Sequence, residues 1–195
     1  TFTTTSIPQI DSSAPTLGEL YQVIRKLKRK KAAGPDDVLP EFLKEIDFEQ
    51  LGPFLDLICD WWNNQSIPPD LLQARVVMIF KKHNPSLLSN YRPISLLNVL
   101  YKIIAALIQR RLAHGMDPLL HDTQFGFRAK RSTADAIHVI RRALDISEAT
   151  GTRTNLLLLD WEKAFDKVHQ KRMLKAIQRF GIPAVSYTHL RAHET

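Results

Sequence analysis

A run of four leucines that ends in an aspartate is the feature that most constrains this chain. Residues 156–159 are all leucine, Asp160 follows directly, and Asp166 lies six positions later. A short apolar run between polar flanks is typical of a strand buried on both faces. Because burial of an ionised carboxylate is costly unless it is paired or binds a metal, we predict that Asp160 binds a cation where this strand reaches a site. The alternative is that Asp160 only begins a turn and Asp166 only caps the next helix.

The charge and the single cysteine limit the classes of function. The 195 residues carry a formal net charge of +7, which favours a polyanionic partner, nucleic acid first. Cys59 lies in an apolar helical pattern, so disulfides and thiolate metal sites are excluded. No apolar run approaches the length of a transmembrane helix, and the first residues lack the apolar core of a signal peptide. We therefore expect an intracellular protein without membrane contact.

Helices are predicted wherever apolar residues recur at helical spacing. The first begins at Thr16, where Glu19 completes a capping-box pattern. The predicted helices span residues 16–31, with the basic run 28–31 at the end of the first, a short segment from Pro40, and residues 51–64, 98–114, 132–150 and 167–180. Trp61 and Trp62 lie on an apolar helix and are expected in the core. No internal repeat, Gly-rich phosphate loop, zinc helix or nucleophile triad is present in the sequence.

A hairpin with cations near its tip is predicted between the helices of residues 51–64 and 98–114. Residues 76–80 are β-favouring and predict a strand, and residues 91–96 predict the return strand. Lys81 and Lys82 follow the first strand directly, and Arg92 lies on the second. Such lysines are commonly solvated and without function. Clustered with Arg92, they are candidates for a phosphate site.

A second candidate region is residues 124–131, which mix two aromatic residues, a glycine and three cations. A segment of this composition can lie along a nucleic-acid backbone while its aromatic side chains pack beneath it. The alternative is an ordinary loop that leads to the helix capped by Ser132. Gly151 is a plausible end for that helix.

Several short blocks occur in fixed order along the chain. They are residues 31–36 (KAAGPD) with 41–44 (EFLK), 90–96 (NYRPISL), 124–128 (QFGFR) and 160–166 (DWEKAFD). In this order they resemble the upstream block, the two fingers motifs and the first palm motif of the reverse transcriptases of non-LTR (LINE-type) retrotransposons. The resemblance covers residues 16–183.

This resemblance implies that the chain belongs to an enzyme that copies a template into DNA with two Mg²⁺ ions. It implies that Asp160 binds both ions and that the backbone N–H groups near Lys163 and Ala164 face the triphosphate. Phe165 matches the ring beneath the incoming sugar, which selects deoxynucleotides. Asp166 is expected to hold the turn and not a metal. The implied partners are an RNA template, a DNA primer and dNTPs.

The fingers motifs imply further contacts. Arg92 matches the arginine that closes on the triphosphate, and either Lys81 or Lys82 supplies a second phosphate contact. Residues Gln124, Gly126 and Arg128 match the segment that supports the template and the nascent base pair.

The expected fold is α+β, a fragment of a right-hand polymerase with helix-rich fingers, a β-hairpin and the first palm strand. We expect a loose lead-in over residues 1–15, the fingers over 16–155 and the start of the palm over 156–183. Residues 184–195 resemble a conceptual translation of sequencing-adapter DNA, so we expect a non-native tail whose histidines bind no metal.

The family's second palm motif, with paired aspartates, has no match in the sequence. No Asp-Asp pair follows Asp36–Asp37, and one carboxylate cannot hold two Mg²⁺ ions. We therefore expect no polymerase activity from these 195 residues alone. The alternatives are a nucleic-acid-binding remnant without catalysis, a group II intron-type reverse transcriptase, and a decayed element without function.

Overall fold

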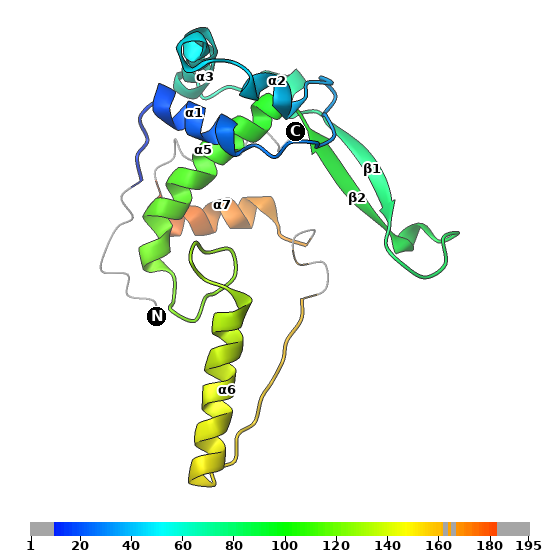
Figure 1. Ribbon diagram of the computed structural model, residues 1–195, viewed down its shortest axis with the longest axis vertical. Coiled ribbons are helices and arrows are strands. Elements are labelled where there is room, and N and C mark those ends of the chain that lie inside the picture. Colours follow the sequence, from blue (N-terminus) through cyan, green and yellow to red (C-terminus); the bar gives the residue numbers. More distant parts are fainter. Residues whose placement is uncertain (1–9, 162–163, 165–166, 183–195) are drawn as a thin grey trace. The chain divides into compact units, whose positions relative to one another are not determined.

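The computed structural model describes residues 10–161, 164 and 167–182, and it divides into two compact units. The N-terminal unit comprises Asp11–Leu112, and the C-terminal unit comprises Ala113–Ile182. Figure 1 shows their helices and the one hairpin in sequence colours. The expected α+β composition is confirmed, since the described residues form helices and one two-stranded antiparallel sheet.

The N-terminal unit is a group of helices around one apolar core, from which a β-hairpin extends (Figure 1). Its helices are α1 (Leu17–Lys26), α2 (Pro40–Lys44), α3 (Gly52–Asn63), α4 (Pro69–Leu72) and α5 (Val99–Met116). The core contains Leu20, Val23, Ile24, Leu43, Leu51, Ile58, Val99, Ile103 and Leu107. Each of these side chains contributes roughly 1.5–3 kcal/mol by leaving water. Trp62 is buried in a second, adjoining cluster, which confirms its prediction as a core residue.

The predicted start of α1 is confirmed in detail. Thr16 Oγ1 accepts from the N–H of Glu19 at 3.3 Å, and Glu19 Oε2 accepts from the N–H of Thr16 at 3.0 Å. This reciprocal pair satisfies two backbone donors that the helix itself leaves free. The local sequence therefore fixes where α1 begins.

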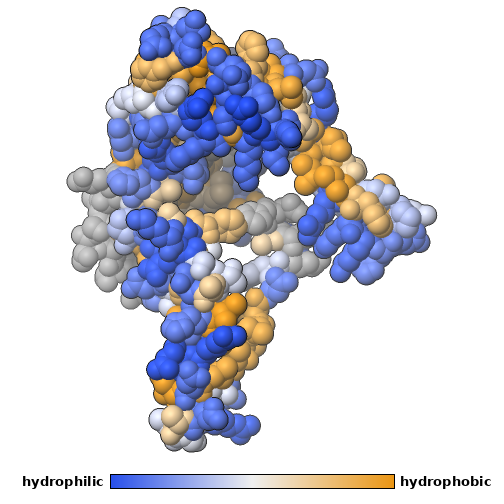
Figure 2. Space-filling model, viewed as in Figure 1, coloured by the Kyte–Doolittle hydropathy of each residue, from blue (hydrophilic) through white to orange (hydrophobic). Residues whose placement is uncertain are grey.

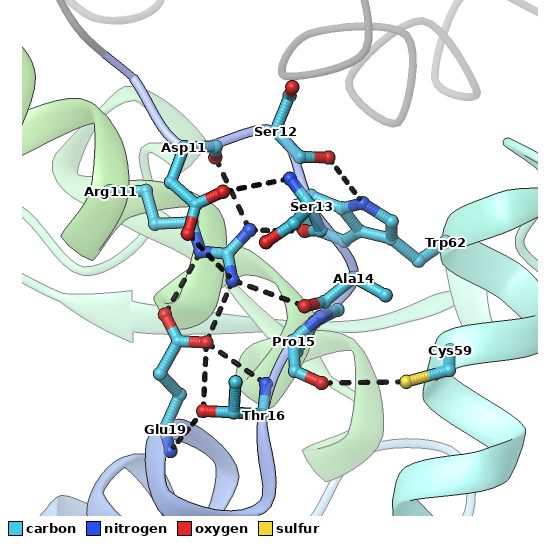
Figure 3. A network of polar contacts seen from close by, with 10 residues as sticks. All are labelled: Asp11, Ser12, Ser13, Ala14, Pro15, Thr16, Glu19, Cys59, Trp62 and Arg111. Carbon is cyan, nitrogen blue, oxygen red and sulfur yellow. Dashed lines mark hydrogen bonds and ion pairs between the residues drawn. The ribbon is translucent and has the colours of Figure 1, made fainter.

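A buried arginine of α5 holds the described part of the lead-in against this unit (Figure 3). The Arg111 guanidinium donates to Glu19 and lies 5.2 Å from the ring centre of Trp62. It also donates to the backbone carbonyls of Asp11, Ser13 and Ala14. Trp62 Nε1 donates to the carbonyl of Ser12 at 3.2 Å. Residues 11–15 are thus irregular and are held by polar contacts.

The C-terminal unit contains α6 (Thr133–Thr150) and α7 (Gln170–Arg179). Ser132 caps α6 through a capping box with Asp135, and Gly151 ends it in the left-handed conformation at φ 66°. Both ends match the sequence prediction. None of the side chains of α6 is buried, and its apolar residues Ile137, Val139, Ile140, Leu144 and Ile146 are exposed.

The prediction that residues 156–159 form a strand buried on both faces is wrong. These leucines lie in a segment without regular secondary structure, and their side chains are 57–79% exposed. A strand needs a neighbour for its backbone hydrogen bonds. Within the described residues the two strands pair only with each other, so nothing pairs with or covers the leucine run.

Among the described residues, no helix combines the length and the apolar character needed to cross a membrane.

Candidate nucleotide and nucleic-acid interface

The first candidate surface is the hairpin formed by β1 (Ala74–Phe80) and β2 (Tyr91–Leu97). Its register pairs Ala74 with Leu97 at the base and Phe80 with Tyr91 near the tip. The Lys81 N–H donates to the carbonyl of Asn90 at 2.9 Å, so pairing continues one step beyond the strands. Both predicted strands are confirmed.

The loop at the tip is held by its own side chains. The rings of Phe80 and Tyr91 lie 5.4 Å apart between centres, and the Tyr91 hydroxyl donates to the carbonyl of Pro85 at 3.0 Å. Asn90 Nδ2 donates to the carbonyl of Asn84 at 2.8 Å. The backbone that presents the two lysines is therefore ordered by local contacts.

The register places Lys81 and Arg92 on one face of the hairpin. Arg92 pairs directly with Ile79, and directly opposed residues of an antiparallel pair share a face. Lys81 lies two residues beyond Ile79, and its N–H still pairs with the carbonyl of Asn90, so Lys81 belongs to that face. Lys82 lies in the bend beyond the paired residues.

All three cations are exposed, and no acidic side chain of the described residues forms an ion pair with them. Figure 2 shows the contrast along the hairpin, with hydrophobic residues over the stem and hydrophilic ones at its far end. Cations without acidic partners, on an ordered loop, are available to the oxygens of a phosphate.

The second candidate surface is the loop of residues 121–131 in the C-terminal unit, which Arg128 organises from inside. Its side chain is 8% exposed and donates to the Asp117 carboxylate, with Nε–Oδ1 at 2.9 Å. It also donates to the backbone carbonyls of Asp117, His121 and Gln124. The hydrogen bond from Arg128 holds the pKa of Asp117 below its ordinary value. The contacts of Arg128 are thus made with the loop itself and with Asp117 before it.

Gln124 and Gly126 lie at the exposed edge of the same loop. Gln124 Nε2 donates to the carbonyl of Gly126 at 3.2 Å. A Cβ built on Gly126 would have only one neighbour within 4 Å, that same Nε2 at 3.9 Å. The described structure therefore leaves the space over Gly126 open, and nothing internal requires a glycine there.

A hollow of about 370 Å³ lies beside this loop. The residues lining it include Phe125, Lys130, Arg131 and His138, and the Arg131 guanidinium lies 6.0 Å from the ring centre of Phe125. Asp122 and Asp135 also line it, so its charge is mixed.

The palm residues are described only in part. Asp160 and Ala164 are exposed, whereas Lys163 and Phe165 lie outside the described residues, as does Asp166. In the described parts of the chain, no three His, Cys, Asp or Glu side chains come together as a metal site. Because Mg²⁺ prefers six oxygen ligands in octahedral geometry, Asp160 by itself does not make a site for it.

The structure brings the predicted residues together in two groups, one in each unit. Lys81, Lys82 and Arg92 share the hairpin, and Gln124, Gly126 and Arg128 share the loop. The sequence analysis missed the structural roles of three polar residues. Arg111 was signalled by its place among the apolar residues of a core helix. Asn98 was expected only at the start of that helix, and Asp117 gave no local signal.

Comparisons with known proteins place the chain in a family. The family model described as "Reverse transcriptase (RNA-dependent DNA polymerase)" matches residues 80–193, more than half of the chain. The chain is 34% identical over 176 residues to the RNA-directed DNA polymerase from mobile element jockey of Drosophila melanogaster, covering 88% of this chain and 19% of that protein. It is 32% identical over 175 residues to the transposon TX1 149 kDa protein of Xenopus laevis, covering 88% and 13%.

A third relative is the retrovirus-related Pol polyprotein from type-2 retrotransposable element R2DM of Drosophila melanogaster, 26% identical over 160 residues, with 81% of this chain and 14% of that protein covered. The chain spans less than a quarter of the length of these curated relatives. These three relatives are named for a mobile element, a transposon and a retrotransposable element, and none of the three is named for a group II intron. The chain belongs to the reverse transcriptase (RNA-dependent DNA polymerase) family, and its resemblance to the enzymes of non-LTR retrotransposons is confirmed.

Proposed function

We propose that this chain forms the fingers and the start of the palm of an RNA-directed DNA polymerase of a non-LTR retrotransposon. The observation that carries the proposal is the ordered hairpin, whose exposed cations lack acidic partners among the described residues. The family match begins at residue 80, at this hairpin. The proposed ligands are an RNA template, a DNA primer and dNTPs.

Lys81 and Arg92 form the proposed triphosphate contact. They share one face of the hairpin, so both can reach the same phosphate chain, whereas Lys82 lies in the bend beyond the paired strands. Arg92 offers a planar pair of donors and Lys81 a point charge, which together suit a flexible polyphosphate. The register therefore supports Lys81 as the second phosphate contact.

Gln124 and Gly126 form the proposed template contact. Gly126 leaves open space into which a nucleic-acid backbone can approach closely, and Gln124 lies beside it with an amide. Arg128 acts through the loop, because its donors are directed at Asp117 and at loop carbonyls.

Asp160 is proposed as one ligand of the catalytic Mg²⁺, with Lys163, Ala164 and Phe165 as contacts of the incoming nucleotide. Mg²⁺ in such enzymes polarises phosphoryl oxygens and activates a hydroxyl nucleophile. Since the 195 residues contain no further aspartate pair after Asp37, we expect no primer extension by this chain alone.

Salt-dependent binding tests the proposal. The chain should bind an RNA template annealed to a DNA primer, and the logarithm of the affinity should fall linearly with the logarithm of the salt concentration. Removing Lys81, Lys82 and Arg92 together by alanine should reduce that slope by about two to three. The matched control removes three other cations of the same unit, Lys26, Lys28 and Arg110.

An equal loss of slope in both triple variants would show that binding depends on overall charge and would contradict the hairpin site. Primer extension with Mg²⁺ by the purified chain would contradict the predicted lack of activity. Binding that persists in Asp160→Ala is expected, because phosphate contacts depend on cations.

A further inference from the structure

The stem of the hairpin lacks lateral support among the described residues. Every residue of β1 is exposed, including Val76, Val77 and Met78 at 41–57%. Figure 1 shows the two strands extending away from the helices of the N-terminal unit. The direction of the tip therefore depends on the contacts at the base.

The first contact at the base is a close approach of two backbones. A Cβ on Gly34 would lie 2.5 Å from the carbonyl carbon of Leu97 and 2.6 Å from the nitrogen of Asn98. Real Cβ atoms are not found at such distances from backbone, so any other residue at position 34 displaces the end of β2. Gly34 thus allows the upstream block to lie directly against the base of the hairpin.

The second contact is the side-chain amide of Asn98, which is 2% exposed. Its Oδ1 accepts from the N–H of Asp36 at 3.1 Å, and its Nδ2 donates to the carbonyl of Asp70 at 2.9 Å. An amide supplies both a donor and an acceptor, which neither a carboxylate nor an apolar side chain can do. Asn98, the first residue after β2, therefore links the end of this strand to the upstream block and to the short helix α4 before β1.

An exposed ion pair adds little to the joint between the upstream block and the base of the hairpin. Arg75 Nη2 lies 3.1 Å from Asp37 Oδ1, but both side chains are largely exposed. Such pairs contribute at most about 1 kcal/mol. The buried contacts of Gly34 and Asn98 are the stronger constraints.

We propose that Gly34 and Asn98 are positioning residues that set the direction of the hairpin and hence the place of Lys81 and Arg92. This inference rests on the proposed function, in which those two cations bind the triphosphate. The upstream block then acts on nucleotide binding without touching the nucleotide, through the base of β2.

Electron spin resonance distances test the joint directly. Two spin labels are placed at Ser86→Cys in the tip loop and at Gln22→Cys on α1, in a Cys59→Ser background. Gly34→Ala and Asn98→Ala are each introduced into this chain, and Gly18→Ala is the matched control, because a Cβ on Gly18 meets nothing within 4 Å. Inorganic tripolyphosphate is the probe of the cations.

The parent and Gly18→Ala should give one narrow distance distribution. Gly34→Ala and Asn98→Ala should broaden or shift it and bind tripolyphosphate about fivefold more weakly or worse. Circular dichroism identifies variants that remain folded, and if Gly34→Ala does not fold, Asn98→Ala decides.

A parent-like distribution in a folded Asn98→Ala variant overturns the proposal, as does a changed distribution with unchanged tripolyphosphate affinity. If the distribution changes but the parent itself binds no tripolyphosphate, the nucleotide assignment of the hairpin fails, and with it the functional part of this inference, while the joint stands.

Discussion

Arg111 donates to both carboxylate oxygens of Glu19, with Nη2–Oε2 at 2.7 Å and Nε–Oε1 at 3.0 Å. The same carboxylate also accepts from the backbone N–H of Thr16 at the start of α1. One side chain thus fixes the helix start and pairs with a buried cation of α5. The start of α1, the lead-in and α5 are therefore coupled energetically.

Replacing Arg111 by lysine should destabilise the chain. Lysine cannot make the bidentate pair and also reach the carbonyls of residues 11, 13 and 14. We expect a loss of about 2 kcal/mol in the free energy of unfolding in urea. Arg110→Lys, an exposed neighbour, is the control, and equal unfolding midpoints for the two variants would contradict the role of the network.

The stability that Glu19 contributes should depend on pH. The hydrogen bond from Arg111 holds the pKa of Glu19 below its ordinary value of 4.5. A group with a lowered folded-state pKa stabilises above its unfolded pKa, and this stabilisation disappears as the pH falls through the folded pKa. The parent should therefore be more stable than Glu19→Gln at pH 7, and the difference should shrink below pH 4.5.

Urea unfolding at several pH values measures this difference, with Glu49→Gln as an exposed control. If the difference in unfolding free energy between the parent and Glu19→Gln stays constant down to acid pH, the charge of the Glu19 carboxylate is not the source of the stabilisation.

Lys81 and Lys82 should differ in their effect on nucleotide binding. Because Lys81 shares a face with Arg92 and Lys82 lies in the bend beyond the paired strands, Lys81→Ala should weaken dNTP binding by about tenfold and Lys82→Ala by much less. Titration of a fluorescent dNTP into each variant measures this. The opposite order would assign the phosphate contact to Lys82.

Gly126→Ala should weaken RNA binding without lowering the stability of the fold. A Cβ at this position has open space, so the melting temperature should not fall. If a template backbone approaches Gly126, the added methyl group should weaken RNA binding by about three- to tenfold. Gly34→Ala is the contrasting variant, since its Cβ would clash internally and should lower the melting temperature. Unchanged RNA affinity in Gly126→Ala would remove this glycine from the interface.

The helix ends and the hairpin could be predicted because their signals are local. Thr16 with Glu19, Ser132 with Asp135, and Gly151 each satisfy backbone groups within a few residues of themselves. The β-favouring runs on the two sides of a polar turn likewise predicted the hairpin and the place of Arg92 on its second strand. For these features no distant partner is required.

The sequence by itself determined the helices, the hairpin, the family and the residue types of the candidate site. Tertiary structure alone decided that Arg128 turns inward, that Asn98 bridges segments 28 and 62 residues away, and that Gly34 meets Leu97. It also decided that residues 156–159 are exposed and not a strand. The reason is that a hydrogen bond or a buried face needs a partner distant in the sequence, and local patterns do not specify which partner is present.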